Sequence, residues 1–122
     1  MILEDQLYDI ERQFWTGGAE TYRAHADEKC LTIFPEMAAL LDREQIARSV
    51  GEKSAGEGGR WRDVAMTRKG MIHPARTVAI ISYEATAQRS DGRPYRALVS
   101  TAYVRRGPDW KMTFHQQTPL ET

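Results

Sequence analysis

The second half of the chain predicts four long β-strands separated by short turns, and this pattern constrains the fold more than any other feature. The expected strands are residues 61–68, 77–88, 95–105 and 110–118. Asp91-Gly92 lies between the second and third strands, and this dipeptide is typical of tight hairpin turns. A second tight turn, Gly107-Pro108-Asp109, precedes the last strand. The pattern therefore indicates an antiparallel sheet built from hairpins.

Neither face of the predicted sheet is uniformly polar. Val78 and Ile80 point to one face, whereas Ala79, Ile81 and Tyr83 point to the other. A sheet with one solvated face would alternate more sharply between apolar and polar residues. We therefore expect both faces to be covered, one by helices and the other by a second copy of the chain in a homodimer.

The last predicted strand becomes polar on both faces near its end. Alternation places Trp110, Met112, Phe114 and Gln116 on one face and His115 and Gln117 on the other. Either the strand frays into solvent there, or the face with His115 looks into a wet pocket.

The first helix is predicted by an apolar stripe. Leu3, Leu7, Ile10 and Phe14 are spaced four, three and four residues apart, which places them on one side of a helix. The glycines at 17–18 are expected to end the helix in a left-handed conformation. The charged residues assigned to the wetter side are Asp5, Asp9, Glu11 and Arg12.

The region up to residue 60 continues with a second helix over residues 19–26 and a strand over residues 30–34. Asp42 and Gln45 have the spacing of a capping box, which predicts a third helix that ends at Gly51. Residues 51–60 are rich in glycine and predict a loop, either a plain linker or a lid.

Composition narrows the class of protein. The 122 residues suit one domain, residues 1–122, and 41% hydrophobic with 28% charged residues is typical of a globular protein. The 17 basic and 17 acidic side chains cancel, which argues against nucleic acid or an anionic membrane as a partner. No apolar run approaches the ~20 residues of a membrane span, and the acidic N-terminus is unlike a signal peptide, so a cytoplasmic protein is expected.

The sequence predicts neither a metal nor another cofactor. Cys30 is the single cysteine, which excludes an intrachain disulfide and a cysteine-based zinc site, and its apolar neighbours predict a buried structural thiol. The three histidines are scattered along the chain without a cluster of carboxylates.

Several stretches resemble the nuclear transport factor 2-like superfamily. The stretches that carry the resemblance are residues 19–22 after the two glycines, residues 31–36, residues 90–93, and residues 104–111 with residues 115–119. The pattern is similar to the SnoaL-like and ketosteroid-isomerase-like branch and to the association domain of calcium/calmodulin-dependent kinase II. The resemblance covers nearly the whole chain. It implies an α+β, cystatin-like cone in which a strongly bent antiparallel sheet wraps around N-terminal helices, with an interior pocket and pairing through the outer sheet face.

In such a cone the face of His115 and Gln117 points inward, by the resemblance. His115 is then the candidate general base, because the reference pKa of histidine lies near neutrality. A base needs an orienting carboxylate, and Asp27 and Glu84 are the candidates. Glu84 either faces the pocket as a second catalytic residue or forms an ordinary ion pair on the other face.

The remaining candidate ligand-binding residues are polar or aromatic. Tyr22, Tyr83 and Tyr103 can each supply a hydroxyl, and Thr101 can orient a ligand. Trp15 and Trp61 are each either a pocket wall or part of the core.

The resemblance implies two alternative functions, and the sequence does not decide between them. The first is binding of a small apolar organic molecule inside the cone, with a cofactor-free isomerase, dehydratase or hydrolase activity as the catalytic form of this function. The alternative is a non-catalytic dimerisation or assembly module whose sheet face carries the function.

Overall fold

A computed structural model of the protein describes residues 2–34, 37–54, 61–89 and 91–120. Its elements, in chain order, are α1 (Leu3–Thr16), α2 (Ala19–His25), β1 (Ala26–Phe34), β2 (Met37–Leu41), α3 (Arg43–Ser54), β3 (Trp61–Ala75), β4 (Val78–Arg89), β5 (Pro94–Arg106) and β6 (Asp109–Pro119).

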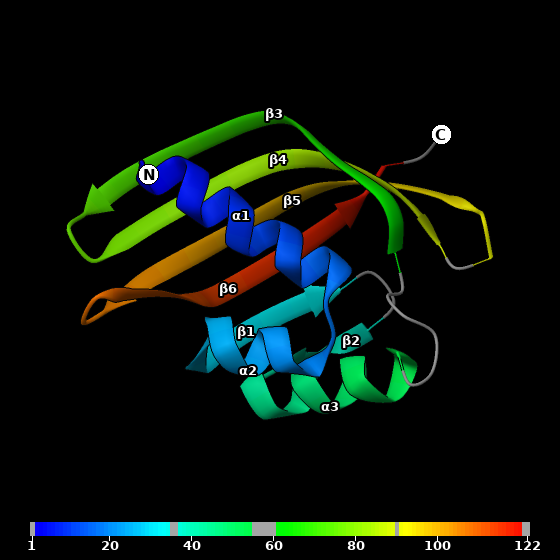
Figure 1. Ribbon diagram of the computed structural model, residues 1–122, viewed down its shortest axis with the longest axis horizontal. Coiled ribbons are helices and arrows are strands. Elements are labelled where there is room, and N and C mark those ends of the chain that lie inside the picture. Colours follow the sequence, from blue (N-terminus) through cyan, green and yellow to red (C-terminus); the bar gives the residue numbers. More distant parts are fainter. Residues whose placement is uncertain (1, 35–36, 55–60, 90, 121–122) are drawn as a thin grey trace.

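The strands form one strongly curved, open sheet in the order β2-β1-β6-β5-β4-β3. All neighbouring strands are antiparallel except β1 and β6, which are parallel. Helix α1 lies across one face of the sheet, and α2 and α3 lie together beside β1 and β2 (Figure 1). The predicted α+β cone is therefore confirmed. Within the described residues, no helix has the length and apolar character that crossing a membrane requires.

Helix α1 covers the inner face of the sheet, which we define as the face that carries Tyr83, Thr101 and Tyr103. Leu7, Ile10 and Phe14 of its predicted apolar stripe are buried and Leu3 is partly buried, but Glu11 is buried with them and has 0% exposure. Glu11 follows Leu7 by one helical turn, on the side that meets the sheet. The assignment of Glu11 to the wetter side was therefore wrong.

The end of α1 needs glycine because of a close approach rather than a left-handed backbone. Gly17 has φ −96°, in the extended region, and its N–H donates to the Gln13 carbonyl oxygen at 2.7 Å. A Cβ at this position would lie 2.2 Å from Thr21 Oγ1. The predicted end of the helix is correct, but the expected left-handed conformation is not.

The predicted capping box of α3 is confirmed. The Gln45 N–H donates to Asp42 Oδ1 at 2.9 Å, and the Asp42 N–H donates to Gln45 Oε1 at 3.0 Å. The helix continues to Ser54, past the predicted end at Gly51, and strand β2 was not predicted. Residues 55–60 lie outside the described residues, so the choice between linker and lid stays a prediction.

The pairing of β5 with β6 decides which residues of the last strand face inward. Tyr103 pairs with Met112 and Ala102 with Phe114, so an irregularity in the ladder places one extra residue in β6. Met112 therefore faces inward and Phe114 outward, which corrects their predicted position on one face. Beyond the irregularity, Thr101 pairs with His115, so His115 lies on the inner face as expected.

Candidate functional site

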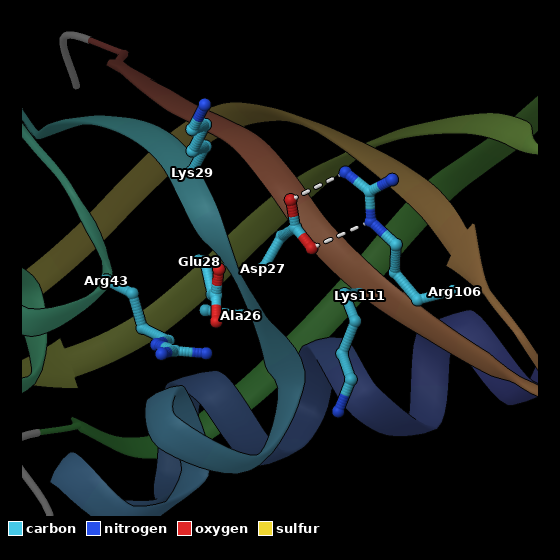
Figure 2. Close-up of a pocket in the computed structure, with 7 residues that line it drawn as sticks. All are labelled: Ala26, Asp27, Glu28, Lys29, Arg43, Arg106 and Lys111. Carbon is cyan, nitrogen blue, oxygen red and sulfur yellow. Dashed lines mark hydrogen bonds and ion pairs between the residues drawn. The ribbon is translucent and has the colours of Figure 1, made fainter.

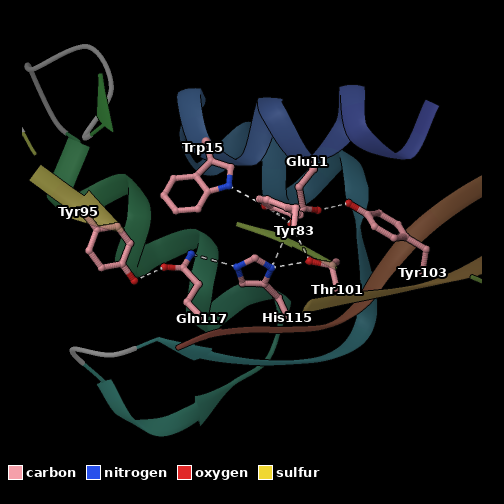
Figure 3. Close-up of polar contacts among 8 residues, drawn as sticks. All are labelled: Glu11, Trp15, Tyr83, Tyr95, Thr101, Tyr103, His115 and Gln117. Atoms are coloured by element: carbon pink, nitrogen blue, oxygen red, sulfur yellow. Dashed lines mark hydrogen bonds and ion pairs between the residues drawn. The ribbon is translucent and has the colours of Figure 1, made fainter. Parts of the chain in front are cut away.

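A buried carboxylate, Glu11 of α1, is the centre of a polar network inside the cone. Three hydroxyls from the sheet donate to it (Figure 3). Tyr83 of β4 and Thr101 of β5 donate to Oε1, at 2.7 and 2.6 Å. Tyr103 of β5 donates to Oε2 at 2.5 Å. Both carboxylate oxygens are therefore satisfied where water is excluded.

His115 lies next to Glu11 and is only 5% exposed. Its Nδ1 is 2.8 Å from Thr101 Oγ1 and 3.4 Å from Glu11 Oε1. A threonine hydroxyl has one proton, and Thr101 donates it to the carboxylate, so Nδ1 must be the donor in the contact with Thr101. The imidazole therefore carries a proton on Nδ1.

The network continues from the other ring nitrogen to Tyr95. Gln117 Nε2 lies 3.1 Å from His115 Nε2, and the Tyr95 hydroxyl donates to Gln117 Oε1 at 2.9 Å. An amide nitrogen can only donate, so His115 Nε2 accepts and the imidazole is neutral in this arrangement. The hydrogen bonds thus run in one direction, from Tyr95 through His115 to Glu11.

The network keeps Glu11 ionised. Burial is the largest influence and raises the pKa of Glu11, but hydrogen bonding with His115 and with the hydroxyls of Thr101 and Tyr103 brings this pKa below its usual value. Burial, and then the negative charge of Glu11, raise the pKa values of Tyr83 and Tyr103 well above the usual value. Both tyrosines therefore stay protonated and act as donors.

Aromatic rings surround the end of the network that contains Tyr95. Trp15 donates from Nε1 to the Tyr83 hydroxyl oxygen at 2.8 Å, and its ring centroid is 5.4 Å from that of Trp61. The ring centroids of Trp61 and Tyr95 are 4.8 Å apart. The Arg89 guanidinium carbon lies over these two rings, 5.3 and 5.0 Å from their centroids. The three rings are inclined to one another by 32° to 72° and form an apolar cluster, in which Tyr95 contacts Gln117.

The structure brings together most of the residues expected to bind a ligand. His115, Thr101, Tyr103 and Gln117 belong to the network, and Trp61 lies in the adjacent aromatic cluster. Tyr22 is buried in the core, where its ring centroid is 4.7 Å from that of Phe14.

The two carboxylates considered as partners of His115 both pair with arginines. Glu84 follows Tyr83 in β4 and so lies on the outer face, where its Oε2 is 3.1 Å from Arg96 Nε. The hydrogen bond from Arg96 is the main reason why the pKa of Glu84 is lowered. Asp27 forms a two-pronged pair with Arg106. The structure therefore places Glu84 in the ion-pair alternative and gives His115 a different carboxylate, Glu11.

Sequence reasoning missed Glu11 and Tyr95. Leu7, Glu11 and Trp15 are spaced four residues apart, and this spacing could have indicated that Glu11 is buried with its apolar neighbours. Among the described residues, no group of three or more histidine, cysteine, aspartate or glutamate side chains could hold a metal ion.

No family model and no curated protein matches the sequence of this chain. Comparison of structures, in contrast, finds many solved proteins with the same architecture. A ketosteroid isomerase-like protein of Parabacteroides distasonis is 13% identical with a TM-score of 0.81, covering 98% of this chain and 89% of that chain. An NTF2-like protein of Cytophaga hutchinsonii is 12% identical with a TM-score of 0.79, over 98% and 100% of the two chains.

Assembly domains show the same architecture. The association domain of Caenorhabditis elegans CaMKII is 12% identical with a TM-score of 0.73, covering 93% of this chain and 90% of that chain. At this identity the likeness concerns the fold alone. The chain therefore has the nuclear transport factor 2-like (NTF2-like) fold, which occurs in ketosteroid isomerase-like proteins and in CaMKII association domains.

Proposed function

We propose that the cone binds a small, uncharged organic molecule beside His115, and that His115 acts on it as a general base. The observation that supports this proposal is the buried pair of His115 and Glu11, because a carboxylate beside Nδ1 orients an imidazole for proton transfer at Nε2. A cofactor-free isomerase, dehydratase or hydrolase would use such a group.

The proton transfer follows from the direction of the hydrogen bonds. Nε2 of neutral His115 has a lone pair, which the Gln117 amide now occupies as a donor. A ligand with an acidic C–H or O–H group in the place of that amide would give its proton to Nε2. The charge of Glu11 would stabilise the imidazolium that forms. Glu11 is thus a positioning residue, and His115 is the residue that would touch the ligand.

The same electrostatics favours an uncharged ligand. Ionised Glu11 is buried and the arrangement of hydrogen bonds leaves His115 neutral, so a ligand carboxylate nearby would be repelled in a medium of low dielectric constant. The rings of Trp15, Trp61 and Tyr95 favour an apolar molecule.

A thermal-shift screen with matched probes tests the proposal. Benzyl alcohol and small cyclic ketones are expected to raise the melting temperature, whereas benzoate is not. A probe present at 100 times its dissociation constant adds about 2.7 kcal/mol to the free energy of unfolding. His115→Ala should lose the response, and His73→Ala, which replaces an exposed histidine of β3, should keep it. Equal responses in the two variants would contradict the role of His115.

Self-association through the outer sheet face is a second candidate function, favoured by a row of apolar side chains. Register pairs align them from strand to strand, and Ile72 and Leu31, at the two ends of the row, are 60% and 48% exposed. The row consists of Ile72, Ile80, Ala102, Phe114 and Leu31. An exposed apolar patch of this kind typically marks an interface between protein chains. We propose that two copies of the chain form a homodimer through it.

Sedimentation analysis tests the dimer. Ile80→Asp places a charge in the middle of the row and should convert a dimer into a monomer that remains folded by circular dichroism. Ile2→Asp is the matched control, because Ile2 is 65% exposed and precedes α1, the helix that covers the opposite, inner face of the sheet. A native chain that sediments as a monomer at micromolar concentration would rule out the dimer.

A further inference from the structure

A groove of about 440 Å³ lies outside the cone network, between the start of β1, the start of α3 and the hairpin that joins β5 to β6 (Figure 2). Its lining is almost entirely charged. The charged residues that line it are Asp27, Glu28, Lys29, Arg43, Arg106 and Lys111.

Two of these charges cancel each other. Arg106 donates from Nε and Nη2 to the two carboxylate oxygens of Asp27, each at 3.0 Å. Figure 2 shows the Asp27 carboxylate turned towards Arg106 and away from Arg43. The hydrogen bond from Arg106 is the largest cause that holds the pKa of Asp27 below its usual value. The other three cations of the groove face only one further carboxylate, that of Glu28.

Arg43 and Lys111 have N–H groups that are available to bind a ligand. In the part of the chain that the structure describes, no carboxylate lies within ion-pair distance of the Arg43 guanidinium. Lys111 Nζ donates one hydrogen bond, to the Ala24 carbonyl oxygen at 2.6 Å, and an ammonium group has three protons. The groove therefore combines an excess of positive charge with unused N–H groups.

We propose that this groove binds a phosphate group, held by Arg43 and Lys111. An excess of two positive charges matches the dianion. A guanidinium offers a planar pair of donors to phosphate oxygens, and an ammonium acts as a point charge beside them. The group belongs either to inorganic phosphate or to a small phosphate monoester.

Thermal-shift titrations at constant ionic strength test the site, with inorganic phosphate and glycerol 3-phosphate as separate probes and sodium chloride as the reference. Phosphate should raise the melting temperature of the native chain to a plateau. Arg43→Gln and Lys111→Gln should each weaken the apparent affinity by about tenfold or more, which corresponds to loss of a charge-assisted hydrogen bond. Tighter binding of glycerol 3-phosphate would identify a monoester, and tighter binding of inorganic phosphate the free ion.

Arg48→Gln is the matched control for Arg43→Gln. Arg48 lies on the same helix, is exposed, and is not part of the groove lining. The Arg48→Gln variant should bind phosphate with the same affinity as the native chain. A native chain without a saturable response, or an equal loss in Arg48→Gln and Arg43→Gln, would overturn the site.

A second measurement does not depend on the melting temperature. Burial, and next the positive charge of Lys111, lower the pKa of His25. A phosphate bound beside Lys111 would offset that charge, so NMR titration of His25 should give a higher pKa with phosphate than with chloride. The rise should be absent in Arg43→Gln, and an unchanged His25 pKa in the native chain would overturn the proposal.

Discussion

Tyr103→Phe is the sharpest test of the buried carboxylate, because it removes one hydroxyl and no ring. The Tyr103 hydroxyl donates to Glu11 Oε2, whereas Oε1 accepts from Tyr83 and Thr101. Tyr103 is 0% exposed, so water has no ready access to replace the lost donor. The variant should therefore leave one oxygen of a buried, ionised group without its hydroxyl donor.

The expected cost follows from the charge of the acceptor. A hydrogen bond to a charged group contributes about 1.5–3 kcal/mol, compared with about 0.5–1.5 kcal/mol between neutral groups. For a domain of this size, 2 kcal/mol lowers the melting temperature by about 6–10 °C. Tyr103→Phe should therefore unfold at clearly lower urea concentration with an unchanged m-value.

A double-mutant cycle with Glu11→Gln separates the hydrogen bond from packing. In the Glu11→Gln background the acceptor is neutral, so Tyr103→Phe should cost about 1 kcal/mol less than in the native chain. Equal costs in both backgrounds would show that Tyr103 does not stabilise a charged Glu11, and would refute the reasoning.

The pH dependence of stability gives an independent check on the same charge. The pKa of Glu11 is lower in the folded chain than its ordinary value of 4.5. The stabilisation from the ionised carboxylate is therefore complete above that value and is lost as the pH falls through the folded pKa. Urea unfolding from pH 7 to pH 3 should show this loss in the native chain and a smaller loss in Glu11→Gln.

Three further predictions concern the helices and the thiol. Gly17→Ala should destabilise the protein by about 1–3 kcal/mol, because the new Cβ would lie 2.2 Å from Thr21 Oγ1. Gly18→Ala is the control: its new Cβ would meet nothing within 4 Å, so this variant should unfold at the native urea midpoint. Asp42→Ala should cost about 1 kcal/mol and speed amide hydrogen exchange in the first turn of α3; unchanged exchange would contradict the cap. Burial raises the pKa of Cys30 to about 11, so iodoacetamide at pH 8 should label it in urea and not in the folded chain.

The sheet was predictable because its signals are local. Each long strand alternates or is apolar over many residues, and Gly92 and Gly107 have φ of +88° and +61° in the turns that separate them. Strand β2 and the extension of β3 to Ala75 carried no such signal. The pairing of β3 with β4 has three irregularities of register, and Asp63 and Arg68 of β3 have positive φ. The alternation of side chains between the two faces cannot be followed through these irregularities.

The orientation of β6 shows where local reasoning fails. Alternation alone places Met112 and Phe114 on one face, but pairing with β5 turns them to opposite faces. The irregularity lies where Thr113 donates to the Lys29 carbonyl oxygen, so a neighbouring strand takes part in setting it. No pattern within residues 109–119 encodes that contact.

Glu11 was missed for a different physical reason. A glutamate on a helix is normally solvated, and its burial is acceptable only where several donors converge on it. These donors come from residues 83, 101, 103 and 115, which are far apart in the sequence and adjacent only through the register of β4, β5 and β6. The helix pattern can show that position 11 faces the sheet, but not that the sheet supplies hydroxyls there.

The composition of the network argues that it has a function beyond stability. An ionised carboxylate surrounded by hydrogen bonds is often no more stabilising than an apolar side chain of similar size. Apolar residues in place of the whole network, including the hydroxyls that donate to Glu11, would therefore complete the core at least as well. What they would not provide is an oriented imidazole beside a fixed negative charge. Glu11→Leu combined with His115→Leu would leave the buried hydroxyls of Tyr83, Thr101 and Tyr103 without their acceptor, so it should be less stable than the native chain. At a temperature where circular dichroism shows it folded, it should no longer bind the uncharged probes that we expect in the cone. A double variant that still binds those probes would show that the network only supports the fold.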